Sequence, residues 1–162
     1  VPGIAWWPGR IKPGTVQNGI ACTMDLFSTS LRLAGAELPG DRVVDGVDLT
    51  DLLLRDAPSP RRTLFFYRGT RLYAVRKDRW KLHLFTQNGY GQPAPEAHEP
   101  PLLFDLGIDP GETFNVAADH LDVVADLRRE IDAHRDTVIP VKSQLDDILV
   151  APESSPSTPA RP

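Results

Sequence analysis

Apolar and polar positions alternate between residues 60 and 106, in short runs that turn residues interrupt. In the clearest run, 80–85, every second residue is apolar, and Lys81 and His83 fall on the opposite face. Three other runs have strand-like composition: 63–67, 71–76 and 102–106. Alternation of this kind is typical of an antiparallel sheet with one face toward solvent. The sequence therefore predicts a four-stranded antiparallel sheet.

A second periodicity, with a spacing of three to four residues, follows the strand region. It covers residues 117–134, where the apolar positions form one stripe: Leu121, Val124, Leu127 and Ile131. Charged residues stay off this stripe, which predicts an amphipathic helix that packs on the sheet.

The first sixty residues have a different pattern. Residues 1–7 form a continuous apolar run, which predicts a strand covered on both faces. Thr23 is a candidate N-cap for a helix that ends at Gly35 or near Pro39. A short helical piece is expected within 47–54. Together these segments predict an α+β chain.

Turn-forming residues mark the boundaries. The sequence Ala-Pro-Ser-Pro at 57–60 continues neither a helix nor a strand, so it is the best domain boundary. Residues 86–95 are expected to form a polar loop. Asp109-Pro110-Gly111 fits a type II turn with Gly at the left-handed position. The tail, 137–162, ends in a Pro/Ser-rich stretch and is predicted to be partly disordered.

Charge and composition narrow the function classes. A net charge of -4 argues against a nucleic-acid partner, which would favour a basic face. No apolar run is long enough to cross a bilayer, so no membrane association is expected. A single Cys excludes an internal disulfide and leaves the compartment undetermined. The chain starts at Val1 without a Met, which reads as a piece of something larger.

Most candidate catalytic chemistry is absent from the sequence. There is no Gly-x-Ser-x-Gly elbow, no His-Glu-x-x-His helix and no Gly-rich phosphate loop. Four carboxylates cluster in sequence: Asp41, Asp45, Asp48 and Asp51. Their spacing does not match an EF-hand loop, so solvated or capping roles are expected and no metal site is predicted. Cys22 is expected to be a small, buried apolar residue at a helix entrance.

The four histidines receive different predictions. His120 and His134 lie near or on the apolar stripe of the last helix, where packing roles are expected. His83 shares a strand face with Lys81. Such a basic pair can bind an anion, but the favoured interpretation is that this strand face is solvated. His98 stands just before Pro100 and Pro101, which fix the backbone and aim the ring.

Several motifs, taken together in their order along the chain, point to a known family. The run AHEPPLLFDL at 97–106 is closed by DPGE at 109–112, and the chain opens with VPGIAWWPG. With Met24-Asp25-Leu26-Phe27 and Leu64-Phe65-Phe66-Tyr67, these motifs resemble the C-terminal third of the formylglycine-dependent sulfatases. The resemblance is to the arylsulfatase A and N-acetylgalactosamine-6-sulfatase group of the alkaline-phosphatase-like superfamily.

The resemblance implies a division of the chain into three parts. Residues 1–60 would be the end of a large alkaline-phosphatase-like α/β domain. Residues 61–136 would form a small domain, a four-stranded antiparallel sheet packed against a C-terminal helix. The tail that follows folds back toward the large domain in such enzymes.

The resemblance also implies the chemistry of the parent protein, a sulfuric ester hydrolase that uses formylglycine and Ca²⁺. The formylglycine arises from a Cys in a Cys-x-Pro/Ala-x-Arg signature, which the residues after Cys22 do not match. The catalytic and metal-binding residues belong to the N-terminal catalytic domain, the expected partner, so this chain alone is predicted to be inactive. His98 is the predicted substrate-contacting residue, because its loop approaches the pocket mouth in these enzymes.

Two other functions stay open at the level of sequence. The chain is alternatively a free-standing, non-catalytic binding or scaffold module. It is alternatively part of a phosphonate or phosphate monoester hydrolase of the same superfamily. Uncovered apolar residues on the 1–7 segment and on the helix after Thr23 predict self-association, which leaves a homo-oligomer open. The sequence names neither the sulfated substrate nor the compartment.

Overall fold

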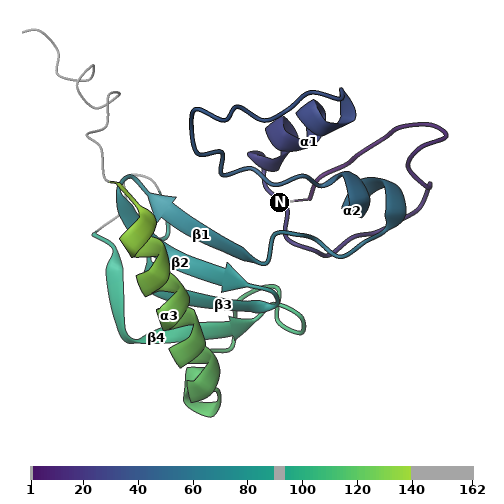
Figure 1. The fold of residues 1–162 in the computed structure, drawn as a ribbon. Helices are drawn as coiled ribbons and strands as arrows, with labels where there is room; N and C mark the ends of the chain where they lie inside the picture. The colour runs from purple at the N-terminus through teal and green to yellow at the C-terminus, as the bar shows by residue number, and fades with distance from the viewer. Residues whose placement is uncertain (1, 90–93, 140–162) are drawn as a thin grey trace, which may run out of the picture.

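The computed structural model describes residues 2–89 and 94–139 of the 162-residue chain. Two short helices precede a sheet, and a long helix follows it (Figure 1). The helices are α1 (Asp25–Leu33), α2 (Thr50–Arg55) and α3 (Leu121–Thr137), with a 3₁₀ turn at Ala117–Asp119. The strands are β1 (Thr63–Arg68), β2 (Arg71–Lys77), β3 (Trp80–Thr86) and β4 (Glu96–Asp105). None of the helices in these residues is long and apolar enough to span a bilayer.

The four strands form an antiparallel sheet in the order β1-β2-β3-β4, which confirms the predicted sheet. One cross-strand ladder joins Phe65, Val75, Leu82 and Leu103. These side chains face α3 and form the core together with Leu127 and Ile131 of that helix. Because Val75, Leu82 and Leu103 are fully buried, the sheet and α3 form a layer pair that closes around its own core (Figure 1).

The opposite face of the sheet, called the open face below, carries the adjacent ladder of Phe66, Ala74, His83 and Leu102. The register between β1 and β2 shifts after Phe66, because Tyr73 is an extra residue on β2. A bulge of this kind re-aims a side chain and increases local twist.

Strand β4 is longer than the sequence predicted. We expected a strand at 102–106 and a loop over 86–95, whereas the strand begins at Glu96 and passes through Pro100 and Pro101. Proline cannot donate to a sheet ladder, so the pattern rules argued against a strand there. β4 is an edge strand, and Pro100 and Pro101 lie where its ladder with β3 is interrupted, between Ala97 and Leu102, so no ladder bond needs their missing N–H.

The predicted strand at 1–7 is wrong for residues 2–7, which adopt no regular structure. Ile4 is fully exposed and Trp6 is 84% exposed. A strand covered on both faces needs neighbouring strands, and none of the described residues pairs with this segment. The segment is apolar, as the sequence analysis noted, but no described strand pairs with it, so Ile4 and Trp6 stay exposed.

Helix α1 lies within the predicted segment, and its end was placed correctly. Gly35 has φ of 73° and its N–H donates to the carbonyl of Arg32, while the N–H of Ala36 donates to that of Leu31. These two bonds form a Schellman motif, which requires a residue that tolerates positive φ. The predicted cap at Thr23 is wrong, because Met24 occupies the N-cap position and makes no side-chain cap.

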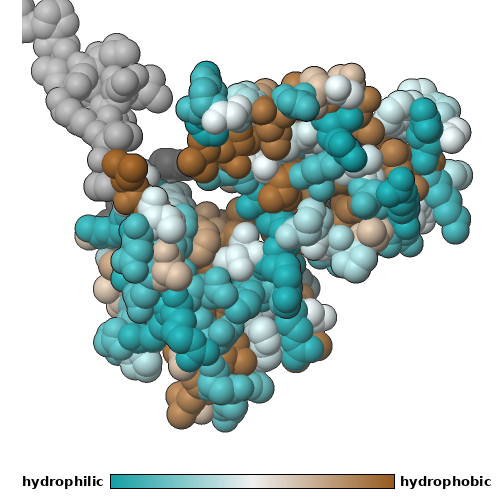
Figure 2. Space-filling model, viewed as in Figure 1, coloured by the Kyte–Doolittle hydropathy of each residue, from teal (hydrophilic) through white to brown (hydrophobic). Residues whose placement is uncertain are grey.

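The burial pattern of α1 is inverted within the described chain. Its buried residues are polar: Asp25, Ser28 and Thr29. Its large apolar residues Leu26 and Phe27 are exposed, as is the N-cap residue Met24. Figure 2 shows such hydrophobic side chains at the surface of the part that contains α1. The exposed apolar patch predicted for this helix is therefore present.

The predicted helix at 117–134 is confirmed, with two differences. The 3₁₀ turn and α3 are separate elements that meet at His120, and α3 continues to Thr137. The type II turn predicted at Asp109-Pro110-Gly111 is wrong, since the left-handed conformation falls one residue later, at Glu112 with φ of 55°. Most of the predicted tail, residues 140–162, lies outside the described residues.

Candidate functional site

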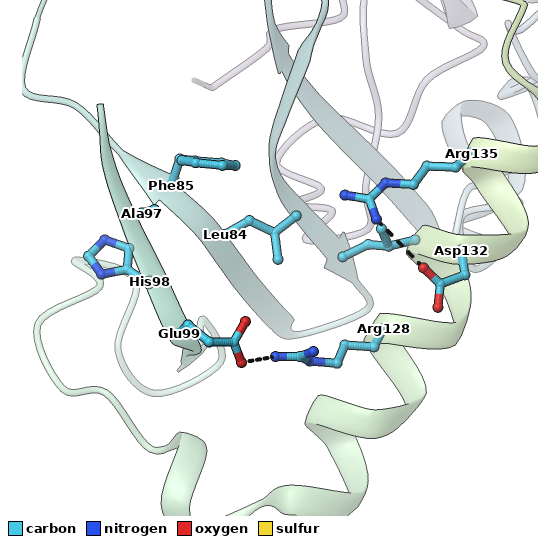
Figure 3. A pocket seen from close by; sticks show the side chains of 9 residues that line it. Leu84, Phe85, Ala97, His98, Glu99, Arg128, Asp132 and Arg135 are labelled. Carbon is cyan, nitrogen blue, oxygen red and sulfur yellow. Dashed lines mark hydrogen bonds and ion pairs between the residues drawn. The ribbon is translucent and has the colours of Figure 1, made fainter. Parts of the chain in front are cut away.

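His98, the residue predicted to contact substrate, lies on β4 and lines a cavity of about 300 Å³ between the sheet and α3. Its Nε2 atom is 2.8 Å from the hydroxyl of Thr86 on the neighbouring strand. Figure 3 shows the imidazole pointing away from α3, on the outer side of the strand. A side-chain partner on β3 and a rigid strand therefore hold the His98 ring.

Charged side chains from α3 line the rest of this cavity. Arg128 donates to Glu99 at 2.8 Å, and Arg135 lies 3.7 Å from Asp132 (Figure 3). All four side chains are at least 45% exposed, so these ion pairs are screened and contribute little to stability. The charges that line the cavity are thus balanced, and Leu84, Phe85, Ala97 and Ile131 form an apolar part of its wall.

A second cluster lies on the open face of the sheet, where Glu112 bridges two basic residues. Its Oε2 atom is 2.6 Å from His83 Nε2, and its Oε1 atom accepts a bond from Lys81 Nζ. The side chains of Lys81 and His83 are only 16% and 15% exposed. The predicted basic pair does meet an anion, but the favoured prediction of a solvated face is wrong.

The surroundings of His83 disfavour its charged form. Burial lowers the pKa of His83 below its usual value, and the nearby Lys81 charge acts in the same direction. Glu112 opposes both effects but does not overcome them. The cluster therefore holds a neutral imidazole at neutral pH, next to a paired Lys–Glu.

A third cluster centres on Asp25 at the start of α1. Its carboxylate accepts bonds from the backbone N–H groups of Cys22 and Val47 and from the guanidinium of Arg61. Burial by itself would raise the pKa of Asp25, but these bonds outweigh it and hold the pKa at about 2. Arg61 also donates to the carbonyl of Asp45 at 2.7 Å. The ion pair thus links the segment before β1 to the α1 region.

Gly46 completes the packing around Asp25. A Cβ atom at this position would come within 2.2 Å of the Met24 carbonyl oxygen, and Ser28 donates to the Gly46 carbonyl at 2.8 Å. The loop at 45–47 can therefore approach α1 only because residue 46 has no side chain.

The remaining histidines have the packing roles that the sequence predicted. The His134 ring stacks on Phe65 with centroids 3.7 Å apart, and its Nε2 is 2.9 Å from the hydroxyl of Tyr67. The His120 ring packs against Trp80 at 4.8 Å. Burial lowers the pKa of His134. Both rings therefore serve the interface between α3 and the sheet.

Cys22 and the clustered aspartates also have structural roles. Cys22 is a free, partly buried thiol whose backbone N–H binds Asp25. Asp48 accepts from the backbone N–H of Thr50 at 2.8 Å, and Asp51 pairs with Arg55 one turn along α2. These are the capping and solvated roles that were expected.

Sequence reasoning missed Glu112 and Asp25 as organising residues. Asp25 pairs with a residue 36 positions away, so no local sequence pattern predicts this ion pair. Glu112 left one signal, since it directly follows a Pro-Gly turn in a block with no helical or strand periodicity. The structure adds a second one, because a non-Gly residue with positive φ is uncommon.

Comparison with known proteins decides the family. Residues 59–160 match the family described as the C-terminal region of aryl-sulfatase. The chain belongs to this sulfatase family. Arylsulfatase A of Bos taurus is 46% identical over 76% of the chain, which covers 27% of that protein. N-acetylgalactosamine-6-sulfatase of Canis lupus familiaris is 38% identical over 89% of the chain and 32% of its own length.

Solved sulfatases share the fold. The PsFucS1 sulfatase from Pseudoalteromonas sp. superposes with a TM-score of 0.76 and 29% identity, over 84% of this chain and 29% of that one. A sulfatase from a Bacteroides thetaiotaomicron locus for metabolism of multiple glycosaminoglycans gives a TM-score of 0.64 at 26% identity, over 80% and 28% of the two chains. The sulfatase chain described here spans about a third, or less, of the length of these relatives. Its four-stranded sheet and C-terminal helix are those of the sulfatase C-terminal region.

Proposed function

We propose that this chain is the supporting C-terminal part of a sulfuric ester hydrolase. The family match over 59–160 carries the proposal, because it covers the sheet and α3 as one unit. Its role is to steady the catalytic region and to shape the rim of the pocket. Residues 1–162 without that region would have no turnover.

The packing supports a division of the chain at residue 60. Residues 61–136 close around their own core and form the small domain. Residues 1–60 belong to the large α/β domain, whose remainder is the N-terminal catalytic region and the chain's principal partner. The exposed side chains of Ile4, Trp6, Leu26 and Phe27 support this assignment, because apolar surface of that extent needs a cover.

Formylglycine and Ca²⁺ would be held by residues outside this chain. Among the residues that the structure describes, no three His, Cys, Asp or Glu side chains are grouped to hold a metal ion. Cys22 binds Asp25 through its backbone and lacks the signature that formylglycine formation requires. In the whole enzyme, formylglycine supplies the nucleophile and Ca²⁺ neutralises charge on the sulfate ester.

His98 is the residue of this chain that we assign to the pocket rim. Its Nε2 atom lies 2.8 Å from the hydroxyl of Thr86, and the residue borders the cavity between the sheet and α3. A fixed imidazole can donate a hydrogen bond to a substituent of a sulfate ester near neutral pH.

The proposal is tested by assaying the full-length protein on an aryl sulfate and on an aryl phosphonate ester. Preferential cleavage of the sulfate is expected. Preference for the phosphonate would assign the chain to the related phosphonate hydrolases. An absence of turnover on both, in protein with its signature Cys converted, would favour the non-catalytic scaffold.

A further inference from the structure

A glycine follows two of the three asparagines of the chain, in the pairs Asn18-Gly19 and Asn88-Gly89. In such a pair the backbone nitrogen of the glycine can reach the side-chain carbonyl carbon of the asparagine, because glycine has no Cβ atom and a freely variable backbone. Both pairs lie outside the helices and strands. The surroundings of each pair therefore determine which of them reacts.

The first pair is held from both sides. Gln17 donates to the carboxylate at the end of α2, and Ser59 donates to the carbonyl of Ile20 at 2.6 Å. Ile20 is buried, and a Cβ atom on Gly19 would come within 2.8 Å of the Ser59 side chain. Ring closure at Asn18 requires the backbone at Gly19 to move, so these contacts oppose it.

The third asparagine is protected by bonds of the reacting groups themselves. Asn115 Oδ1 accepts from the backbone N–H groups of Leu103 at 3.0 Å and of Ala117 at 3.1 Å. The next backbone nitrogen, that of Val116, donates to the carbonyl of Leu103 at 2.9 Å. Attack on the Asn115 side chain would therefore break bonds at both the carbonyl and the nitrogen.

The pair Asn88-Gly89 has neither kind of restraint. Asn88 is exposed and lies shortly after the end of β3, and neither residue has a hydrogen-bond partner among the described residues. Asn88 lines a cavity of about 400 Å³ on the open face of the sheet, together with Arg68. A positive charge nearby favours the anionic form of an attacking backbone nitrogen.

We propose that Asn88 is the site at which this protein deamidates. The backbone nitrogen of Gly89 attacks the side-chain carbonyl carbon of Asn88, and a C–N bond forms between them. The bond from that carbon to the amide nitrogen breaks, and ammonia leaves with the proton that the Gly89 nitrogen gives up. One water molecule then opens the cyclic imide to aspartate or isoaspartate.

The product carries a carboxylate where the chain had a neutral amide. It adds one negative charge to a chain with a net charge of -4 and places that charge in the same cavity wall as Arg68. Isoaspartate also lengthens the backbone after β3 by one methylene group. The modification needs no enzyme, so its extent increases with the time since synthesis, and it is independent of sulfate ester cleavage.

The test incubates the full-length protein at mildly alkaline pH and follows the tryptic peptides 11–32 and 82–128 by mass spectrometry, with fragment ions to locate the change. Reaction at Asn88 is expected to be at least about tenfold faster than at Asn18, because local opening must precede reaction at Asn18. In urea the two pairs should react at similar rates, since unfolding removes the difference in surroundings. Gly89→Ala should slow the reaction at Asn88 about tenfold.

A second pair of variants tests the protection of Asn18. Ser59→Ala removes the bond to Ile20 and should raise the rate at Asn18 about fivefold. Thr137→Ala is the matched control, because the Thr137 hydroxyl also donates to a backbone carbonyl, but one at the end of α3. Thermal unfolding shows whether both variants fold; if Ser59→Ala does not, the folded and urea rates of the parent decide.

Two results would overturn the inference: equal rates at Asn18 and Asn88 in the folded protein, or an Asn88 that reacts in urea but not in the folded protein. An unchanged rate at Asn18 in a folded Ser59→Ala protein would contradict the protective role of the contact with Ile20. Turnover of an aryl sulfate, which tests the proposed function, affects none of these outcomes.

Discussion

Arg61 binds both carboxylate oxygens of Asp25, a side chain with no exposed surface that lies 36 residues earlier in the chain. The pair joins the segment that leads into β1 to the first turn of α1. Because Arg61 is itself only 11% exposed, solvent screens the interaction weakly. It is the ion pair in the described residues on which we expect stability to depend most.

Replacing Arg61 with Leu should destabilise the chain strongly. The change leaves the buried Asp25 carboxylate without its charge partner, and breaking a buried pair in this way costs about 3 kcal/mol or more. Urea unfolding gives the free energy. Arg55→Leu is the matched control, because the Arg55–Asp51 pair is exposed and should contribute at most about 0.5 kcal/mol. Equal effects of the two substitutions would contradict a special role for the buried pair.

Asp25 should also make stability depend on pH in the acid range. Its pKa is about 2 in the folded chain, against about 3.9 in an unfolded one, so folding favours the ionised form. The resulting stabilisation is present above about pH 4 and is lost as the pH falls through 2, with a size of about 2 kcal/mol. Urea midpoints measured at pH 5 and at pH 2 should therefore differ less in Asp25→Asn than in the parent chain. The same difference in both would reject the assignment.

Glu112 should keep the pKa of His83 from falling further. Burial and Lys81 lower this pKa, whereas Glu112 and, to a smaller extent, a hydrogen bond with the Phe85 backbone raise it. Glu112→Gln is therefore expected to lower the pKa of His83, measured by NMR titration of its ring protons. Glu99→Gln is the control, because Glu99 pairs with Arg128 instead. A higher pKa of His83 in Glu112→Gln would contradict this account.

The lowered pKa of His83 also has a consequence for stability. An imidazole with a depressed folded pKa binds protons more readily in the unfolded chain. Its contribution to stability is therefore present above about pH 6.5 and decreases as the pH falls below that value.

The parts of the fold that the sequence predicted are those whose partners lie close in the chain. The ladder from Phe65 to Leu103 and the stripe of α3 bury one another, so their periodicity is a sufficient signal. Residues 2–7 have an equally clear apolar pattern, but no described element covers them, and the same rule failed. Strand β4 was predicted only from 102, because its first half, with Pro100 and Pro101, pairs irregularly with β3 and has no strand periodicity.

The candidate sites were predictable only in part, for a similar reason. The pairing of Lys81 with His83 followed from strand alternation, but their shared partner Glu112 comes from a loop about 30 residues later. Tyr73 is the extra residue of the bulge in β2, which the sequence analysis did not predict. These sites are formed by contacts between helices, strands and loops, which the residue pattern within a single element does not predict.

Residues 1–162 in isolation should expose enough apolar surface to self-associate or to bind a hydrophobic dye. Trp6, Leu26 and Phe27 are 84%, 60% and 50% exposed. Dye fluorescence and light scattering measure the effect, and the double substitution Trp6→Lys and Phe27→Lys should reduce both. Ile108→Lys is the control, since Ile108 is exposed on the far loop after β4. A monomeric, dye-silent chain would count against the proposed division at residue 60.

His98→Ala in the full-length enzyme should raise KM for the substrate about tenfold, with a smaller change in kcat. The ring is assigned to binding at the pocket rim, and the loss of one hydrogen bond to a charged group costs about 1.5 kcal/mol. Thr86→Val removes the hydroxyl that fixes the ring, so it should raise KM in the same direction but by less. His120→Gln is the control, because that ring packs on Trp80, at the opposite end of β3 from Thr86. If His98→Ala left both constants unchanged while the enzyme remained active, the residue would be a structural histidine of β4 with no part in substrate binding.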